Sequence, residues 1–489
     1  MDVADETATG TSAPAGQSED RPDEGRAFGP RFVTPLFMGS ALNPINSSVI
    51  ATALVSIAAA MGVPVGQTAI LISSLYLTCA VAQPTAGRLA EEFGPRRVFL
   101  AGIAIVLAGG IIGGLGQDLM TLVVARVLIG LGTSAGYPSA MLLIRRRATA
   151  VGLQSPPLGV LGGLSIAGAA TVAVGPTIGG LLVGWFNWRA AFLVNVPVTV
   201  ITFAMALLWI AKDPDRVGGH SLREIVTRVD LLGVAGFGGS MTALLVYLLG
   251  LPRADWTALG ISVVLAGALV WWELRAANPF LDMRLLVSNL PLTRTYVRNG
   301  LSLLGIYVTL YGLTQWLEVA HGMSPYEAGL VLIPMGVMSA VSARVVSRRH
   351  DIRGPLVLSA ILIIAGAVAT FFLTSNSPII AIIGTTALVG VMSGASNVAN
   401  QTALYKEAPA EKVGTASGLL RTFGYVGSIA SATITGIVFR VRVDDAGLRH
   451  VSVIMIGIGV VVLLMTAFDR QLARSDQAHT HVHPSSQNG

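Results

Sequence analysis

Charge is what this sequence has least of. Only 12% of its 489 residues are Asp, Glu, Lys or Arg, whereas a soluble globular protein is about 25% charged. Hydrophobic residues make up 53% of the chain, and the mean hydropathy is +0.69. A water-soluble core does not account for this deficit, but a bilayer does, because apolar runs of about 20 residues can face its hydrocarbon. The composition therefore predicts an all-α, multi-pass membrane protein.

Groups that carry chemistry are also scarce. The one cysteine, Cys79, lies in an apolar run and excludes a disulfide framework or a cysteine-based metal site. Histidine occurs only in predicted loops, linkers and tails, at His220, His321, His350, His450, His479, His481 and His483. No phosphate-binding P-loop string is present. We therefore expect no enzyme, no ATP-driven pump, no catalytic residue, no metal and no cofactor.

Fourteen apolar stretches recur along the chain, separated by short loops of Gly, Pro and charged residues. Polar residues interrupt the stretches near Gly305 and Val426, and the count depends on these two. The predicted transmembrane helices are 32–60, 67–87, 97–116, 119–143, 158–184, 189–211, 230–250, 256–275, 295–320, 326–346, 355–374, 378–404, 414–438 and 450–469.

The basic residues test this count independently. Of the 32 Lys and Arg residues, 25 fall on one side of the predicted membrane, five on the other, and two in or at the ends of spans. Basic loops face the cytoplasm, so the fourteen spans place both termini there. The excess of basic residues behind the pI of 9.7 then reflects the orientation of the protein in the membrane. We therefore expect no nucleic acid as a partner.

The spacing of the spans predicts two six-helix halves around a central binding site, as in alternating-access carriers. The acidic N-terminal segment lacks an apolar face and is expected to be disordered. The predicted parts are a cytoplasmic tail (1–31), the N-terminal six-helix bundle (32–211), a cytoplasmic linker (212–229), an inserted helix pair (230–275), a second cytoplasmic linker (276–294), the C-terminal six-helix bundle (295–469) and a cytoplasmic tail (470–489).

The loop after the second span reads GRLAEEFGPRRVFL. It resembles the loop signature of the major facilitator superfamily, although Glu91 replaces the usual Asp, and Glu92 and Pro95 stand where basic residues are common. Gly87 and Gly94 permit a tight turn, and Glu91 can pair with Arg from a neighbouring helix. The resemblance implies a conformational latch between the halves, formed by Gly87, Glu91, Gly94, Arg96 and Arg97.

The fourth span contains Arg126, followed by Gly130 and Gly132. A lone Arg at membrane depth costs about 2.5–3.5 kcal/mol, so it usually faces a partner or a water-filled cavity. The string resembles the superfamily's fourth-helix motif, which implies a role in proton handling. The alternative is that Arg126 lies near enough to the outer face for its side chain to reach the interface.

The fifth span contains GPTIGG, and this string resembles the antiporter signature of drug:proton antiporters. Proline removes a backbone donor and bends a helix, while glycines allow close helix contact. The candidate antiporter helix is formed by Gly175, Pro176, Gly179 and Gly180. Together with Trp188-Arg189, Asn195-Val196-Pro197 and the segments 322–334 and 413–428, the string resembles the fourteen-helix, multidrug-efflux-like branch of the superfamily over residues 32–470.

This resemblance implies a major facilitator fold of two six-helix bundles with two additional transmembrane helices between them. In that branch the first helix commonly carries a membrane-embedded Asp, but Asn46 stands at that place here. Asn43, Asn46 and Ser47 share one helical face. They either offer hydrogen bonds to a substrate or bridge helices.

Four polar residues share a face of the ninth span: Tyr307, Tyr311, Gln315 and Glu318. Such a stripe suits a binding cavity, and the alternative is an aromatic pair at the lipid interface. Glu318, near the outer end of this span, is the candidate proton carrier, with Arg126 modulating it, because Glu273 and Asp230 lie near the inner ends of theirs and most other acids lie in loops or the N-terminal tail. The candidate substrate-binding residues are Asn43, Asn46, Tyr307, Tyr311 and Gln315.

The substrate class follows from the lack of a central carboxylate. Lipophilic cations need a buried negative charge, so we expect neutral or weakly anionic hydrophobic compounds such as drugs, antibiotics or natural products. The expected protein is a monomeric exporter in a bacterial inner membrane, driven by proton antiport with alternating access. The alternative is an uncoupled or inward carrier of a neutral metabolite.

Overall fold

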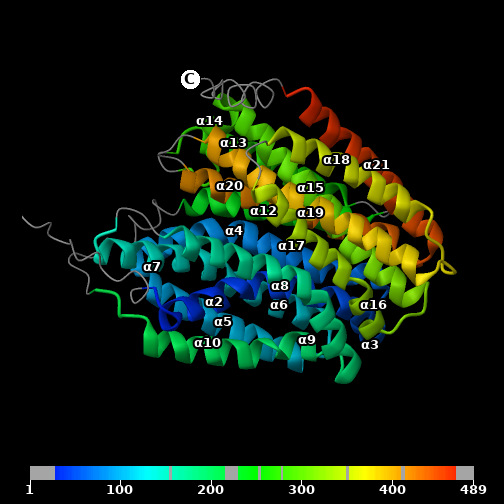
Figure 1. Ribbon diagram of the computed structural model, residues 1–489, viewed down its shortest axis with the longest axis horizontal. Coiled ribbons are helices and arrows are strands. Elements are labelled where there is room, and N and C mark those ends of the chain that lie inside the picture. The colour runs from blue at the N-terminus through cyan, green and yellow to red at the C-terminus, as the bar shows by residue number, and fades with distance from the viewer. Residues whose placement is uncertain are drawn as a thin grey trace, which may run out of the picture.

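The computed structural model describes residues 28–153, 157–214, 230–251, 255–276, 279–348, 352–408 and 413–469. Within these ranges the secondary structure is helical and contains no strand. The predicted tails and the linker 212–229 lie mostly outside them. Two groups of long helices pack face to face, one coloured blue to green and the other green to red (Figure 1).

The first group forms an N-terminal half. Its first predicted span is broken into α2, a 3₁₀ turn and α3, and its fourth span into α6 and α7. The elements are α2 (Pro30–Val49), η1 (Ile50–Ala53), α3 (Leu54–Met61), η2 (Val65–Thr68), α4 (Ala69–Phe93), α5 (Pro95–Leu115), α6 (Leu119–Ser134), α7 (Gly136–Ala150), α8 (Leu158–Trp185), α9 (Ala190–Leu193) and α10 (Asn195–Trp209).

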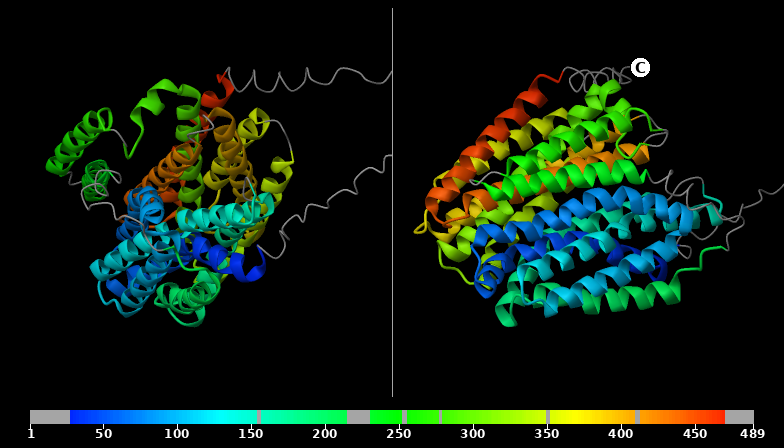
Figure 2. Two further views of the ribbon diagram at one scale, coloured as in Figure 1. Left: turned by 90° about the vertical axis from the view of Figure 1, so that its left-hand side faces the viewer. Right: turned by 180° about the vertical axis from the view of Figure 1, so that it is seen from behind.

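A pair of helices and then a C-terminal half follow. The inserted pair stands at the side of the molecule in the left view of Figure 2, where α12 packs against α4 and α20. The elements are α12 (Leu231–Gly250), α13 (Trp256–Glu273), α14 (Met283–Ser288), α15 (Leu290–Val319), α16 (Pro325–Val331), α17 (Ile333–Ser347), α18 (Arg353–Phe371), α19 (Ile379–Glu407), α20 (Val413–Val438) and α21 (Asp445–Ala467).

The helices are long and apolar enough for a bilayer. Among the described residues, 11 helical segments have the length and apolar composition needed to cross a membrane. Three further long helices, α8, α15 and α20, occupy the remaining predicted spans. The polar residues that interrupt the stretches near Gly305 and Val426 lie in α15 and α20. The fourteen-span count therefore stays a prediction, and the all-α fold is confirmed.

Short polar caps fix where several helices begin. Asp118, for example, accepts from the Thr121 backbone N–H at 2.8 Å, and the Thr121 hydroxyl and this N–H together lower the pKa of Asp118. A capping side chain satisfies backbone donors that a helix start leaves open. Equivalent caps precede α12, α13, α14, α15, α16 and α21 at Asp230, Asp255, Asp282, Asn289, Ser324 and Asp444.

The loops gather at two opposite ends of the helix bundle. We call one the basic end, where Arg88 donates to the Pro279 carbonyl at 3.0 Å and Arg353 to the Ala467 carbonyl at 3.1 Å. At the far end, Arg440 donates to the Leu249 carbonyl at 3.2 Å. Loops alternate between the two ends along the chain, in the order that the predicted topology requires.

Candidate functional site at the interface between the two halves

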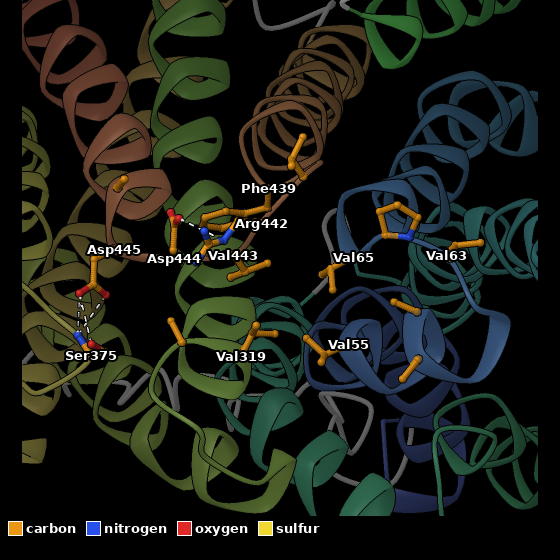
Figure 3. Close-up of a pocket in the computed structure, with 16 residues that line it drawn as sticks. Val55, Val63, Val65, Val319, Ser375, Phe439, Arg442, Val443, Asp444 and Asp445 are labelled. Atoms are coloured by element: carbon orange, nitrogen blue, oxygen red, sulfur yellow. Dashed lines mark hydrogen bonds and ion pairs between the residues drawn. The ribbon is translucent and has the colours of Figure 1, made fainter.

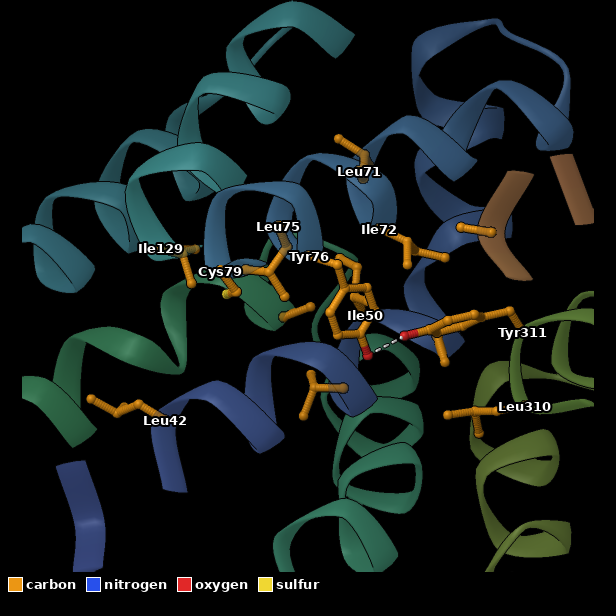
Figure 4. Packing of buried hydrophobic residues seen from close by; sticks show 14 of the residues in the cluster. Leu42, Ile50, Leu71, Ile72, Leu75, Tyr76, Cys79, Ile129, Leu310 and Tyr311 are labelled. Carbon is orange, nitrogen blue, oxygen red and sulfur yellow. Dashed lines mark hydrogen bonds between the residues drawn. The ribbon is translucent and has the colours of Figure 1, made fainter. Parts of the chain in front are cut away.

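Four tyrosines meet where the two halves pack together at mid-depth: Tyr76 of α4, Tyr307 and Tyr311 of α15, and Tyr425 of α20. The hydroxyls of Tyr76 and Tyr311 are 3.0 Å apart, and Figure 4 shows them pointing at each other from opposite halves. Ring centroids lie 5.4 Å apart for Tyr76 and Tyr307 and 5.5 Å apart for Tyr307 and Tyr311. The predicted stripe on α15 therefore faces the protein interior, and its lipid-interface alternative is wrong.

Two amide side chains extend this tyrosine cluster. The Tyr425 hydroxyl donates to Oε1 of Gln83, which links α20 to α4. Gln315 is 1% exposed, and its Oε1 has no hydrogen-bond partner. One turn later, Oε1 of the half-buried Glu318 also lacks a partner. A buried acceptor without a donor costs free energy. Gln315 and Glu318 therefore offer free acceptor oxygens on this side of α15 to a bound molecule or a proton.

Arg126 lies inside the N-terminal half, where it is 1% exposed. Its Nε donates to the Leu71 carbonyl at 2.9 Å and its Nη1 to the Asn46 carbonyl at 3.0 Å, while Nη2 has no partner. Burial excludes the alternative that Arg126 reaches the membrane interface. The hydrogen bonds of Arg126 thus go to neutral carbonyl groups and not to a carboxylate.

The break in the first span follows two carbonyl groups that accept hydrogen bonds at this site. The change from α to 3₁₀ geometry at η1 interrupts the helical hydrogen-bond ladder. The carbonyls of Asn46 and Ser47, just before this break, accept from Arg126 and from the Tyr311 hydroxyl, the latter at 3.1 Å. The broken helix therefore connects the arginine to the tyrosine cluster.

The amides on the first helix contact other helices. Asn46 and Asn195 exchange hydrogen bonds of 2.6 and 2.9 Å, and Asn46 Nδ2 also donates to the Leu42 carbonyl at 2.8 Å. Asn43 donates to Thr133 Oγ1 at 3.1 Å and to the Cys79 sulfur at 3.0 Å. In this conformation both amides bridge helices, and a substrate contact by Asn46 would require its pair with Asn195 to open.

The glycines of α8 lie against neighbouring backbones. A Cβ on Gly175 would come 1.8 Å from Ser48 Oγ, and one on Gly179 would come 2.4 Å from the Val49 carbonyl. A Cβ on Gly180 would come 2.3 Å from the Pro325 carbonyl in the C-terminal half. Close contact of this kind needs small residues, so α8 joins α2 on one face and α16 on the other.

The Thr177 hydroxyl, between Pro176 and the later glycines, donates to the Gly329 carbonyl at 2.9 Å. Gly329 is equally constrained, because a Cβ there would come 2.8 Å from the Pro176 carbonyl. The candidate antiporter helix therefore forms part of the contact between the halves, close to the far end.

The predicted latch loop is held by an acid that the sequence does not single out. Asp213, after α10, accepts from the backbone N–H groups of Arg96 and Arg97 at 3.3 and 2.9 Å and pairs with Arg146 Nη1 at 3.0 Å. Glu91 is exposed. In this conformation the loop is therefore fastened within the N-terminal half, by Asp213.

One expectation about this loop is wrong. Gly87 was expected in the turn, but α4 continues through it to Phe93, because the following Arg-Leu-Ala-Glu-Glu run favours a helix. The turn is made at Gly94, whose φ of +94° suits glycine. A Cβ at Gly94 would also come 2.4 Å from an Asp213 carboxylate oxygen.

We expect Asp213→Asn to loosen the loop at the basic end. An amide keeps one acceptor oxygen and points a donor at groups that are donors themselves, a loss of about 1–3 kcal/mol. Hydrogen exchange of the Arg96 and Arg97 amides should become about tenfold faster or more. Asp118→Asn at the far end is the control, and unchanged exchange in Asp213→Asn would contradict this assignment.

A second contact between the halves, about one helical turn from the tyrosine cluster toward the basic end, is not revealed by the sequence. The Arg421 guanidinium of α20 lies 3.7 Å from the ring centroid of Tyr137 of α7. A cation over an aromatic face is attracted by the ring quadrupole. Residues 137 and 421 belong to different halves, so this contact helps to hold the halves together on the basic-end side of the tyrosine cluster.

A cavity of about 830 Å³ opens between the halves at the far end. Figure 3 shows Val55, Val63 and Val65 on one wall and Val319 and Val443 on the other. Ser375, Arg442, Asp444 and Asp445 also line the cavity, so valine surface that suits a hydrophobic molecule lies beside charged side chains. Glu318 precedes Val319 in α15 but is not one of the residues that line this cavity.

The comparisons with known proteins decide the family. The model of the Major Facilitator Superfamily matches residues 36–432. The chain belongs to the major facilitator superfamily. This transporter is 35% identical to the uncharacterized MFS-type transporter YwoD of Bacillus subtilis (strain 168), over 89% of this chain and 95% of that protein.

Other relatives have names that refer to resistance. The transporter is 30% identical to the tetracenomycin C resistance and export protein of Streptomyces glaucescens, over 83% of this chain and 75% of that protein. It is 26% identical to the multidrug efflux pump LfrA of Mycolicibacterium smegmatis, over 81% and 78%. Homologues of the transporter thus include antibiotic and multidrug efflux proteins.

Solved structures agree on the fold. The POT family transporter PepTSo has a TM-score of 0.65 at 13% identity and covers 92% of this chain and 99% of its own. The nucleoside transporter NupG has a TM-score of 0.63 at 11% identity, with 89% and 99% covered. At these identities the likeness establishes a major facilitator fold and says nothing of substrate.

We expect Tyr311→Phe to weaken the contact between the halves without disturbing its packing. The hydroxyl bridges Tyr76 of the opposite half and the Ser47 carbonyl, and each such hydrogen bond contributes about 1 kcal/mol. The purified variant should unfold at a lower temperature. Tyr405→Phe, at a residue that is 56% exposed, is the control and should unfold as the wild type does. Equal unfolding temperatures for all three proteins would contradict the prediction.

Proposed function

We propose that the transporter exports small hydrophobic compounds, neutral or weakly anionic, by proton antiport with alternating access. The observation that carries this proposal is the interface between the halves, which contains buried tyrosines and amides, a far-end cavity with valine walls, and the Glu318 carboxyl with one oxygen that lacks a hydrogen-bond partner. Aromatic and amide groups bind neutral molecules without a counter-charge. The resistance and export named for the relatives support the direction of transport.

The orientation is part of the proposal. With the basic end in the cytoplasm, both termini are cytoplasmic, the protein spans a bacterial inner membrane fourteen times, and the far-end cavity faces outward. The domains are then the two bundles 32–211 and 295–469 with the pair 230–275 between them. A monomer holds the whole pathway, since both walls of the cavity come from one chain.

The proton route begins at the far-end cavity. From there a proton would reach Glu318, the residue before the cavity-lining Val319, and its arrival would favour closure of the far end around a neutral carboxyl. Arg126, connected to the tyrosine cluster through the Asn46 and Ser47 carbonyls, would respond to the protonation state of this region. Antiport results because the substrate and the proton bind alternately at the interface between the halves.

Everted membrane vesicles test coupling and direction. An imposed pH gradient, acidic inside, should drive accumulation of a neutral hydrophobic probe such as an uncharged antibiotic, and collapsing the gradient should release it. Accumulation that is unaffected by the gradient would refute proton antiport. Substrate counterflow that persists without any gradient, in the absence of gradient-driven accumulation, would instead support an uncoupled carrier of a neutral metabolite.

A susceptibility panel tests the substrate class. In a strain without its own exporters, the transporter should raise resistance to neutral or weakly anionic hydrophobic compounds and leave resistance to quaternary ammonium dyes unchanged, because desolvated cations need a buried negative charge. A spectrum restricted to cations would overturn the proposed class while leaving export itself in place.

A further inference from the structure

The inserted helix pair contains a buried pair of carboxyl groups away from the candidate pathway. Asp230, which caps α12, is 4% exposed, and Glu273, at the end of α13, is 0% exposed. A Cβ on Gly233 would come 2.3 Å from Asp230 Oδ2 and 2.5 Å from Glu273 Oε1. The two carboxylate oxygens are therefore within 4.8 Å of each other, the sum of these distances.

The two acids have opposite surroundings. Asp230 accepts three hydrogen bonds: from the Gly233 N–H at 3.1 Å, the Trp272 indole N–H at 2.7 Å and the Phe280 N–H at 2.8 Å. This set of donors stabilises a carboxylate anion. Neither oxygen of Glu273 accepts a hydrogen bond of good geometry, although the backbone N–H groups of Leu281 and Phe280 face it from the connection after α13. A second anion buried beside the first would therefore be compensated far less than Asp230 is.

The charged groups around Glu273 come from two elements. Asp230 of α12 is the negative one, and Arg88 of α4 is the positive one whose charge reaches Glu273. The Arg88 guanidinium donates to the Pro279 carbonyl at 3.0 Å. Asp282, from the same connection, caps α14 at the Leu285 N–H instead.

We propose that Asp230 and Glu273 form a proton-binding site in the inserted helix pair, with Asp230 ionised and a proton resident on Glu273. Two buried carboxyl groups this close, with well-formed hydrogen bonds on only one of them, share a single negative charge. The site touches the connection after α13 through Phe280, and Arg88 fastens the adjacent Pro279 to the N-terminal half. Loss of the proton would therefore disturb the docking of the inserted pair on α4.

Infrared difference spectroscopy of the purified full-length protein at neutral pH tests this without a substrate or a gradient. The spectrum of Glu273→Gln, compared with the wild type, should lack one protonated-carboxyl C=O band per chain. Asp118→Asn is the matched control, because Asp118 is an ionised cap, and it should lose carboxylate bands instead. Glu273→Ala provides a second variant with the same expected loss.

Each other outcome counts against the proposal. Loss of carboxylate bands in Glu273→Gln or Glu273→Ala would show that Glu273 is ionised. Gln reproduces the shape and neutrality of a protonated Glu, so a Glu273→Gln protein that fails to fold would show that the negative charge is required, which also overturns the assignment.

Discussion

Gly180→Val is expected to abolish most transport while leaving the protein folded in the membrane. A side chain at Gly180 would meet the Pro325 carbonyl at 2.3 Å and the Gly329 Cα at 3.3 Å, and backbone atoms cannot rotate away as side chains can. Overpacking costs about 1–3 kcal/mol. The two halves can relieve it only by separating at the far end. We therefore expect about a 5- to 150-fold bias toward a conformation open at that end.

Accessibility labelling separates this effect from misfolding. A cysteine introduced at Val55, on the cavity wall, should react faster with a membrane-impermeant thiol reagent in Gly180→Val than in the parent protein, while transport falls. Gly384→Val is the matched control on another long helix, because no atom lies within 4 Å of a Cβ there. Unchanged labelling together with unchanged transport would show that the α8–α16 contact does not govern opening.

The helices could be predicted from the sequence, because a bilayer imposes one length and one kind of surface on every span. The differences lie at helix starts. α15 begins at Leu290 and α21 at Asp445, each five residues before the predicted start. Asn289 and Asp444 cap these helices in polar sequence outside the apolar stretch. Hydropathy does not register a cap, although the cap residues themselves are visible.

The faces of the candidate site were also predictable, but their partners were not. Helical spacing placed Tyr307, Tyr311 and Gln315 on one face, and the structure buries that face. The helical spacing did not show that Tyr76, 235 residues away in the sequence, lies opposite this face. Tyr76 and Gln83 are seven residues apart and share a face of α4, a signal that could have found them. Which helix opposes which face depends on tertiary packing.

The position of an acidic residue in the sequence was the least reliable guide to the groups that it contacts in the structure. Asp213 and the pair of Asp230 and Glu273 lie at ends of predicted spans, where acids are ordinarily solvated. Burial and hydrogen bonds set their roles, and both depend on loops folding back over helix ends. Arg126 is different, because an arginine inside an apolar stretch already implies a partner.

Glu318→Gln is expected to reduce gradient-driven accumulation in everted vesicles about tenfold or more. This reduction corresponds to a rise of about 1.4 kcal/mol or more in the activation free energy of the coupled step. An amide cannot carry a proton, yet it keeps the shape and neutrality of the protonated side chain. Glu318 has an oxygen without a hydrogen-bond partner and precedes Val319 at the cavity. Substrate counterflow, which needs no proton, should therefore continue in this variant.

The conservative variant distinguishes coupling from packing. Glu318→Asp keeps the ionisable group and should retain accumulation, whereas a purely structural role would be harmed at least as much by the shorter side chain. Accumulation in Glu318→Gln at the wild-type level would exclude Glu318 as the proton carrier. Because Asn46 is an amide engaged with Asn195, the first helix could not take over that role, and the coupling group would have to be sought on another element.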